Sequence, residues 1–106
     1  MTNNNLTTFG EFIRQLREES KLPLRKVAAV LDIDQSQLAK IERGERQPTK
    51  VIIKDIAKFF KQDEHQLTIT YLSDVIAYQI INEEDGLEAL KVAEKKVKYF
   101  KTKNNQ

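Results

Sequence analysis

The residue types that could do chemistry concentrate in the middle of the chain. Between Lys40 and Lys61 the sequence carries seven basic residues against three acidic ones, whereas the net charge of the whole 106-residue chain is only +2. A basic segment of this kind is the electrostatic footprint expected of a module that contacts phosphate groups. The charge distribution therefore makes a nucleic acid the first candidate partner.

The single histidine, His65, raises the possibility of metal binding or acid–base catalysis. It follows Asp63 and Glu64, and three such groups could form a metal or acid–base site. Three consecutive polar residues at the expected start of a helix are more typical of capping. Cysteine is absent, and the three glycines stand too far apart for a phosphate-binding loop. We therefore expect no enzyme activity, no metal site and no cofactor.

Helical periodicity runs through most of the chain and predicts an all-α protein. Apolar residues recur at helical spacing in segments near 9–20, 23–31, 35–43, 50–60, 64–82 and 86–100. The piece 68–71 is rich in β-forming residues, so a strand is the alternative there. The polar residues from about 101 onward predict a disordered tail.

Several residues are suited to begin or end these helices. Thr8 and Glu11 have the spacing of a capping box, and Asp34 and Thr49 can cap the third and fourth segments. Gly44 can end the third segment, since glycine adopts the left-handed conformation without strain.

The order of elements is most informative in LRKVAAVLDIDQSQLAKIERGERQP, from Leu24 to Pro48. Two short helices are separated by a tight turn in which Ile33 should point inward. Ala28 must be small because the helices cross closely there, and Leu38 and Ile41 should pack back on the first helix. This is the order that a helix-turn-helix requires if its second helix is to enter a DNA major groove.

This stretch resembles the Cro and phage-repressor type of helix-turn-helix regulators, also called Xre-like. The resemblance runs from about Phe9 to Leu67 and is closest in IERGERQP, from Ile41 to Pro48. It implies a five-helix repressor-like domain over residues 1–66, followed by a C-terminal helical extension over 67–106. Asp32 stands where the family usually has glycine. Because aspartate tolerates positive φ, we expect an intact turn at a modest cost in stability.

The resemblance also implies roles for individual side chains. The residues in base-reading positions are Gln35, Ser36, Gln37 and Lys40. Glutamine can pair with adenine N6 and N7, and lysine can donate to guanine O6 and N7. The candidates for phosphate contact are Arg25, Arg43, Arg46 and Lys50. Lys54 and Lys58 continue the stripe from Lys50 but are more typical of a solvated helix face.

Two further positions match a structural feature of the family. Arg17 and Glu42 stand where these regulators pair an arginine of the first helix with the glutamate before the closing loop. We expect a partly buried ion pair that ties the first helix to the recognition helix.

The last forty residues predict two amphipathic helices that need something to cover them. They could fold back on the domain, or they could pack against a second subunit, which we favour because a two-fold dimer reads two half-sites about 34 Å apart. The expected dimer interface consists of Tyr71, Leu72, Val75, Ile76, Tyr78, Leu90, Val97 and Phe100.

These observations favour a cytoplasmic regulator that binds double-stranded DNA as a homodimer and acts as a repressor or operon controller. The N-terminus lacks a secretory signal, and no apolar run approaches the ~20 residues needed to span a membrane. The alternative is an antitoxin that binds a toxin through its C-terminal helices and represses its own promoter. RNA binding is less favoured because the sequence shows no aromatic stacking platform.

Overall fold

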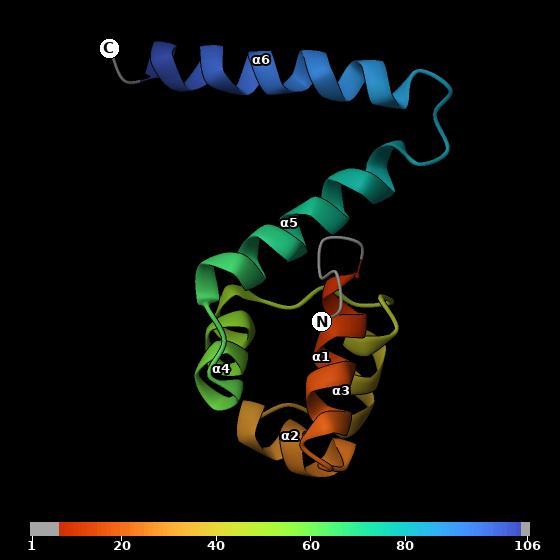
Figure 1. Ribbon diagram of the computed structural model, residues 1–106, viewed down its shortest axis with the longest axis vertical. Coiled ribbons are helices and arrows are strands. Elements are labelled where there is room, and N and C mark those ends of the chain that lie inside the picture. The colour runs from red at the N-terminus through yellow and green to blue at the C-terminus, as the bar shows by residue number, and fades with distance from the viewer. Residues whose placement is uncertain (1–6, 105–106) are drawn as a thin grey trace. The chain divides into compact units, whose positions relative to one another are not determined.

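The computed structural model describes residues 7–104, and this part of the chain contains six α-helices and no strand (Figure 1). The helices are α1 (Phe9–Glu19), α2 (Leu24–Leu31), α3 (Gln35–Glu42), α4 (Lys50–Phe60), α5 (Glu64–Ile80) and α6 (Gly86–Asn104). The all-α prediction is confirmed. Residues 68–71 lie inside α5, so the alternative of a strand there is wrong.

The chain divides into two compact units, one ending at Asp74 and one beginning at Val75. This division lies after the boundary predicted at residues 66 and 67. The reason is that the first half of α5 is attached to the first unit, with Leu67 buried in its core and Tyr71 packed against that core. The N-terminal part of α5 therefore belongs to the helix-turn-helix unit rather than to the extension.

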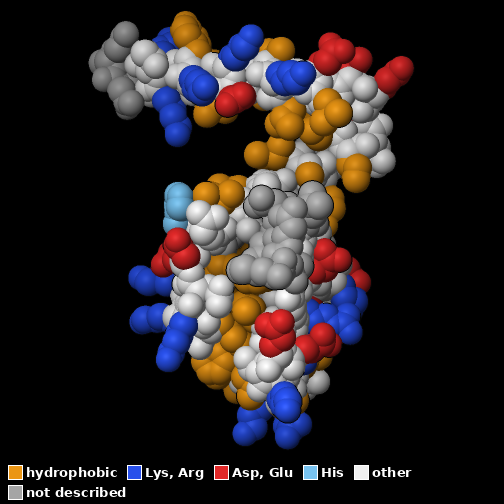
Figure 2. Space-filling view, viewed as in Figure 1, with side chains coloured by type: hydrophobic (Ala, Val, Ile, Leu, Met, Phe, Trp, Pro, Cys, Tyr) orange, Lys and Arg blue, Asp and Glu red, His pale blue; other side chains and the backbone are white. Residues whose placement is uncertain are grey.

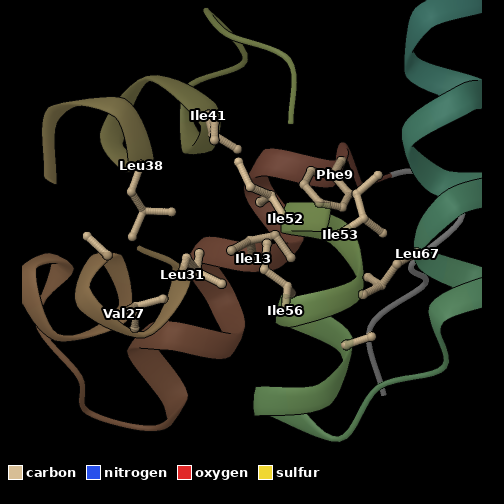
Figure 3. Packing of buried hydrophobic residues seen from close by; sticks show 12 residues of the cluster. Phe9, Ile13, Val27, Leu31, Leu38, Ile41, Ile52, Ile53, Ile56 and Leu67 are labelled. Atoms are coloured by element: carbon tan, nitrogen blue, oxygen red, sulfur yellow. The ribbon is translucent and has the colours of Figure 1, made fainter. Parts of the chain in front are cut away.

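The core of the first unit is built from the apolar faces of α1 to α4 and of the first half of α5 (Figure 3). Its buried residues are Phe9, Ile13, Val27, Ala28, Leu31, Leu38, Ile41, Ile52, Ile53, Ile56, Ala57 and Leu67. Helix α3 contacts both α1 and α2, and α2 also contacts α4. Because each helix buries one face against several others, the position of α3 is fixed from behind.

Thr8 and Thr49 form the N-caps predicted for α1 and α4. The Thr8 hydroxyl accepts from the Glu11 N–H at 3.1 Å and Glu11 Oε1 accepts from the Thr8 N–H at 3.0 Å, which confirms the capping box. Thr49 accepts from the Ile52 N–H at 3.1 Å and begins α4. Lys21 and Lys61 adopt φ of 58° and 54° after α1 and α4, where the sequence carries no glycine.

Helix α6 is longer than predicted. It continues to Asn104, so the disordered tail expected from about 101 is wrong for residues 101–104, while residues 105–106 lie outside the described part. Lys101 and Lys103 in the last turn complement the negative end of the helix dipole, which favours the extra turn. None of the described helices combines the length and apolar composition needed to cross a lipid bilayer.

Candidate nucleic-acid interface

The turn between α2 and α3 has the geometry that a helix-turn-helix requires. Asp32 ends α2 in the left-handed conformation, with φ of 57° and ψ of 45°, as the sequence predicted for this position. The Ile33 N–H donates to the Ala28 carbonyl at 3.0 Å, which closes the turn. Ile33 packs against the core and Ala28 is buried, so the two helices meet closely at the predicted small residue.

Helix α3 has one buried face and one exposed face. Leu38 and Ile41 are buried in the core, and Glu42 is buried beside them. Of the predicted base-contacting residues, Gln35, Ser36 and Lys40 are exposed and Gln37 is half-buried. Ser36 and Lys40 are four residues apart and share a face of the helix. The structure thus brings these polar side chains together on the first turns of a short helix that is held from behind.

The residue at the N-cap position of α3 does not form the side-chain hydrogen bond expected of a cap. Asp34 has the extended conformation of an N-cap, with φ of −69° and ψ of 148°, but within the described residues its side chain makes no capping hydrogen bond. Pro23 stands at the same position before α2 and has no side-chain donor or acceptor to cap it. The first N–H groups of both helices therefore lie where an external acceptor could satisfy them.

Arg17 and Glu42 form the ion pair that joins α1 to the end of α3. Arg17 Nε donates to Glu42 Oε2 at 2.8 Å and Nη2 donates to Glu42 Oε1 at 3.0 Å. The third contact runs from Nη1 to the Leu22 carbonyl at 3.0 Å. The two side chains are only 12% and 5% exposed, and the hydrogen bond to Glu42 is the main cause of the raised pKa of Arg17. This two-pronged geometry fixes the angle between the two helices.

Gly10 has a role at the same junction that the sequence analysis missed. A Cβ added to Gly10 would lie 2.5 Å from the carbonyl oxygens of both Ile41 and Glu42. Only glycine lets α1 approach the last turn of α3 this closely. The sequence signal was a glycine inside the first turn of an otherwise apolar helix, a position where glycine has low helix propensity.

The predicted phosphate contacts lie on three separate segments. Arg25 is exposed in the first turn of α2, Arg43 and Arg46 are exposed just after α3, and Lys50 is exposed at the start of α4. Figure 2 shows basic side chains projecting from the outer side of α4 and from α2. Basic side chains beside α3, the helix predicted to read bases, are what contact with a phosphate backbone would require.

Arg43 forms an ion pair with a neighbouring carboxylate. Its Nε donates to Glu45 Oε2 at 2.8 Å and its Nη2 donates to Glu45 Oε1 at 3.2 Å. This hydrogen bonding raises the pKa of Arg43 and lowers the pKa of Glu45, although both side chains are more than half exposed. Arg43 must exchange Glu45 for a phosphate if it is to contact DNA.

The loop that carries Arg46 is held by α5. Gly44 turns the chain with φ of 76°, and the Gln47 side-chain oxygen accepts from the Tyr71 hydroxyl at 3.0 Å. The Tyr71 ring also packs edge-on against Phe9 of α1, with ring centroids 6.2 Å apart. Tyr71, predicted as a dimer contact, is therefore engaged inside its own unit.

A second contact to α1 was not predicted. Asp74 of α5 accepts from the Phe9 N–H at 2.8 Å, at the positive end of the α1 dipole. Partial burial raises the pKa of Asp74, the hydrogen bond from Phe9 opposes that shift, and nearby Glu11 adds to it. Together with Tyr71, this residue fastens α5 to the helix-turn-helix.

The other predicted dimer contacts lie on the distal part of α5 and on α6. Val75 is half-buried, and the exposed ones are Leu72, Ile76, Tyr78, Leu90, Val97 and Phe100. His65 is exposed on the first turn of α5, where its backbone N–H donates to Asp63 Oδ1 at 2.9 Å. Within residues 7–104, no cluster of three histidine or carboxylate groups is placed to hold a metal ion.

Comparison with known proteins supports this geometry. A family model described as helix-turn-helix matches residues 13–74, well over half of the chain. The protein belongs to the helix-turn-helix family of Cro and Xre type, whose members are DNA-binding transcriptional regulators. A search of curated proteins found no match.

Proposed function

We propose that the protein regulates transcription by inserting α3 into the major groove of a specific DNA site. The observation that carries this proposal is the arrangement of α3. Its polar side chains Gln35, Ser36 and Lys40 are exposed, while Leu38 and Ile41 anchor the helix in the core. Residues near the start of such a helix reach the base edges first. Gln35 and Gln37 would pair with adenine, and Lys40 would donate to guanine.

The contacts to the DNA backbone would come from the surrounding segments. Arg25 and the uncapped start of α2 would meet one phosphate strand, and Arg46 and Lys50 would meet the other side of the groove. Arg43 would join them after releasing Glu45. These contacts supply affinity and salt dependence, whereas the α3 side chains supply sequence preference.

We further propose that the protein acts as a homodimer and works as a repressor or operon controller. One α3 of eight residues reads few base pairs, so a second copy is needed for high specificity. The exposed apolar residues of α5 and α6, including Ile76 and Val97, supply surface for that second copy. Occupation of a promoter by such a dimer would block or redirect transcription.

An antitoxin role is the second candidate, and the same exposed apolar surface is the observation that favours it. A toxin chain would then cover α6 in place of a second copy. The two roles differ in the oligomeric state of the purified protein. Sedimentation that shows a dimer at micromolar concentration supports the regulator that acts with itself, and a monomer supports the antitoxin.

Selection of bound sites from a random pool of duplex DNA tests the regulator proposal most broadly. We expect an enriched site with two-fold symmetry and half-site centres about 10 base pairs apart, because a dimer presents two recognition helices one helical turn apart. Failure to enrich any sequence above the starting pool would contradict sequence-specific reading. An enriched site without symmetry would contradict the dimer and leave the α3 assignment standing.

A further inference from the structure

The loop between α3 and α4 is fixed at both of its ends. At its start, the Gly44 N–H donates to the Ile41 carbonyl at 3.1 Å. At its end, Pro48 is buried and Thr49 caps α4. The residues between these ends, 45–47, are exposed. The two ends therefore determine where the loop begins and stops, but they do not determine the position of its middle.

The middle of this loop is held from α5. Within residues 7–104, the backbone N–H groups of Arg46 and Gln47 donate to no acceptor of the chain. The side-chain contact in this part of the loop is the hydrogen bond from the Tyr71 hydroxyl to Gln47 Oε1, at 3.0 Å. In Figure 1 the connection from α3 to α4 passes beside the first half of α5, where Tyr71 lies. A single donor on α5 thus fixes the loop between its two ends.

The hydroxyl of Tyr71 is not needed to keep α5 in place. The Tyr71 ring packs edge-on against Phe9 and against the core, and a phenylalanine ring can make the same contacts. Asp74, nearly one turn further along α5, accepts from the Phe9 N–H at 2.8 Å. Helix α5 therefore stays attached to α1 without the hydroxyl. Because the hydroxyl bonds to Gln47, its contribution is to the loop.

The same hydrogen bond decides which atoms of Gln47 can bind a ligand. Gln47 Oε1 accepts from Tyr71, so the amide nitrogen Nε2 keeps two N–H donors that have no acceptor in the described part of the chain. Amide side chains contact DNA phosphates as arginine and lysine do. Arg46 precedes Gln47 and is exposed. The contact from α5 thus holds one cationic and one neutral donor on the same short stretch of exposed loop.

We propose that Tyr71 is a positioning residue for DNA binding, and that its hydroxyl holds the loop between α3 and α4 so that Arg46 and Gln47 meet the phosphate backbone. This role rests on the DNA contact in the proposed function and adds a residue of α5 to it. Tyr71 acts through Gln47 and touches no DNA itself. Because a loop that is already ordered loses less conformational entropy on binding, the hydroxyl raises affinity without changing sequence preference.

The variant Tyr71→Phe tests this role in the full chain, because it removes the hydroxyl and keeps the ring. Its affinity for the selected duplex and for a random duplex should fall by about three- to tenfold, as expected for one net hydrogen bond. Its thermal midpoint without DNA should fall by less than about 4 °C. A fall as large as that of Tyr71→Ala would overturn the role, because the hydroxyl would then support the fold. The matched control is Tyr99→Phe, which removes an exposed hydroxyl from α6 and should change neither quantity.

Double-variant cycles show whether the hydroxyl acts through the loop. In a Gln47→Ala background, Tyr71→Phe should change the affinity by less than about twofold, because the acceptor of the hydroxyl is already absent. In an Arg46→Ala background its effect should also shrink, because the contact that the loop presents to phosphate is gone. Equal effects of Tyr71→Phe in the natural chain and in both backgrounds would overturn the positioning role.

Backbone ¹⁵N relaxation measures the position of the loop without DNA. In the natural chain the N–H order parameters of Arg46 and Gln47 should be close to the value of about 0.85 that is typical of a rigid backbone, and in Tyr71→Phe they should fall below about 0.6. Gly44 and Thr49, at the fixed ends of the loop, should keep their order parameters. Unchanged order parameters at Arg46 and Gln47 would overturn the claim that the hydroxyl holds the loop.

The failure of the positioning role can be distinguished from the failure of the proposed function. A natural chain that binds neither duplex overturns the proposed function, and the role of Tyr71 in DNA binding fails with it. A natural chain that binds the selected duplex, with Tyr71→Phe binding it equally well, overturns the positioning role alone. A loss confined to the selected duplex also overturns that role, because the hydroxyl would then affect base reading rather than the backbone contact.

Discussion

The helix-turn-helix unit and helix α6 meet the requirement of burying apolar surface in different ways. In the first unit each of α1 to α4 buries at least two residues, and α3 buries three in only eight positions. In α6, nineteen residues contain one buried residue, a glycine at the start. An isolated helix of this length is marginal in water, so most of its stability must come from packing. The first unit buries its apolar faces within one chain, whereas the apolar residues of α6 are buried only if another surface covers them.

The largest expected loss of stability comes from removing the ion pair of the first unit. Glu42→Ala leaves Arg17 buried without its partner and should lower the free energy of unfolding by about 3–5 kcal/mol. Glu45→Ala is the matched control, because its pair with Arg43 is exposed and should contribute at most about 1 kcal/mol. Chemical denaturation followed by circular dichroism measures both. A Glu42→Ala variant that melts normally and only loses DNA affinity would contradict the structural role of the pair.

Truncation of one apolar side chain in each region sharpens the comparison. Ile13→Ala removes a fully buried side chain and should cost about 2–5 kcal/mol at any protein concentration. Val97→Ala should have an effect that depends on concentration, since its side chain is about half exposed in the single chain and the proposed dimer would bury it. Thermal melts across a hundredfold dilution series measure the difference. Equal and concentration-independent losses for both variants would contradict it.

Gly10 and Gly86 allow the two units to be compared by substitutions that crowd the backbone. Gly10→Ala forces a Cβ against the carbonyl oxygens of Ile41 and Glu42, and overpacking of this kind costs about 1–3 kcal/mol of global stability. Gly86→Ala produces a similar clash with Ile80, but within the second unit. Hydrogen exchange should therefore show general loss of protection for Gly10→Ala and loss confined to α6 for Gly86→Ala. A general loss in both variants would contradict the independence of the two units.

The smallest effect concerns Asp74, which fastens α5 to α1. Because its pKa is raised in the folded protein, the folded state holds the proton more tightly, and this stabilisation is present at low pH and lost as the pH rises through the folded pKa. The stability of the wild type relative to Asp74→Asn should fall over that interval and be level above it. Asp74→Ala leaves the Phe9 N–H without its acceptor and should cost about 1 kcal/mol near pH 7. A stability difference that rises with pH would contradict the assignment.

The sequence allowed prediction of those features that depend on residues near one another in the chain. The capping box of Thr8 and Glu11 follows from local backbone preferences. The left-handed Asp32 followed from the family's glycine at that position together with the tolerance of aspartate for positive φ. The positions of Arg17 and Glu42 followed from resemblance to a family, because 25 residues separate them. Their contact could not have been derived from spacing alone.

The features that the sequence did not predict depend on the meeting of distant segments. The need for glycine at position 10 arises from the carbonyls of α3, and the contacts of Tyr71 and Asp74 arise from the return of α5 to α1. Tyr71 was placed in the dimer interface because apolar spacing identifies a buried face without identifying what buries it. Lys21 and Lys61 adopt positive φ although nothing in their side chains favours it.

The most direct test of the account measures how Gln35→Ala and Arg46→Ala bind a selected duplex and a random duplex at several salt concentrations. Gln35→Ala should lose about 1–3 kcal/mol on the selected duplex, with relaxed preference at one base position and little change on random DNA. Arg46→Ala should weaken binding to both duplexes alike and reduce the salt slope by about one. Equal losses on selected and random DNA for Gln35→Ala would contradict the claim that α3 reads the bases.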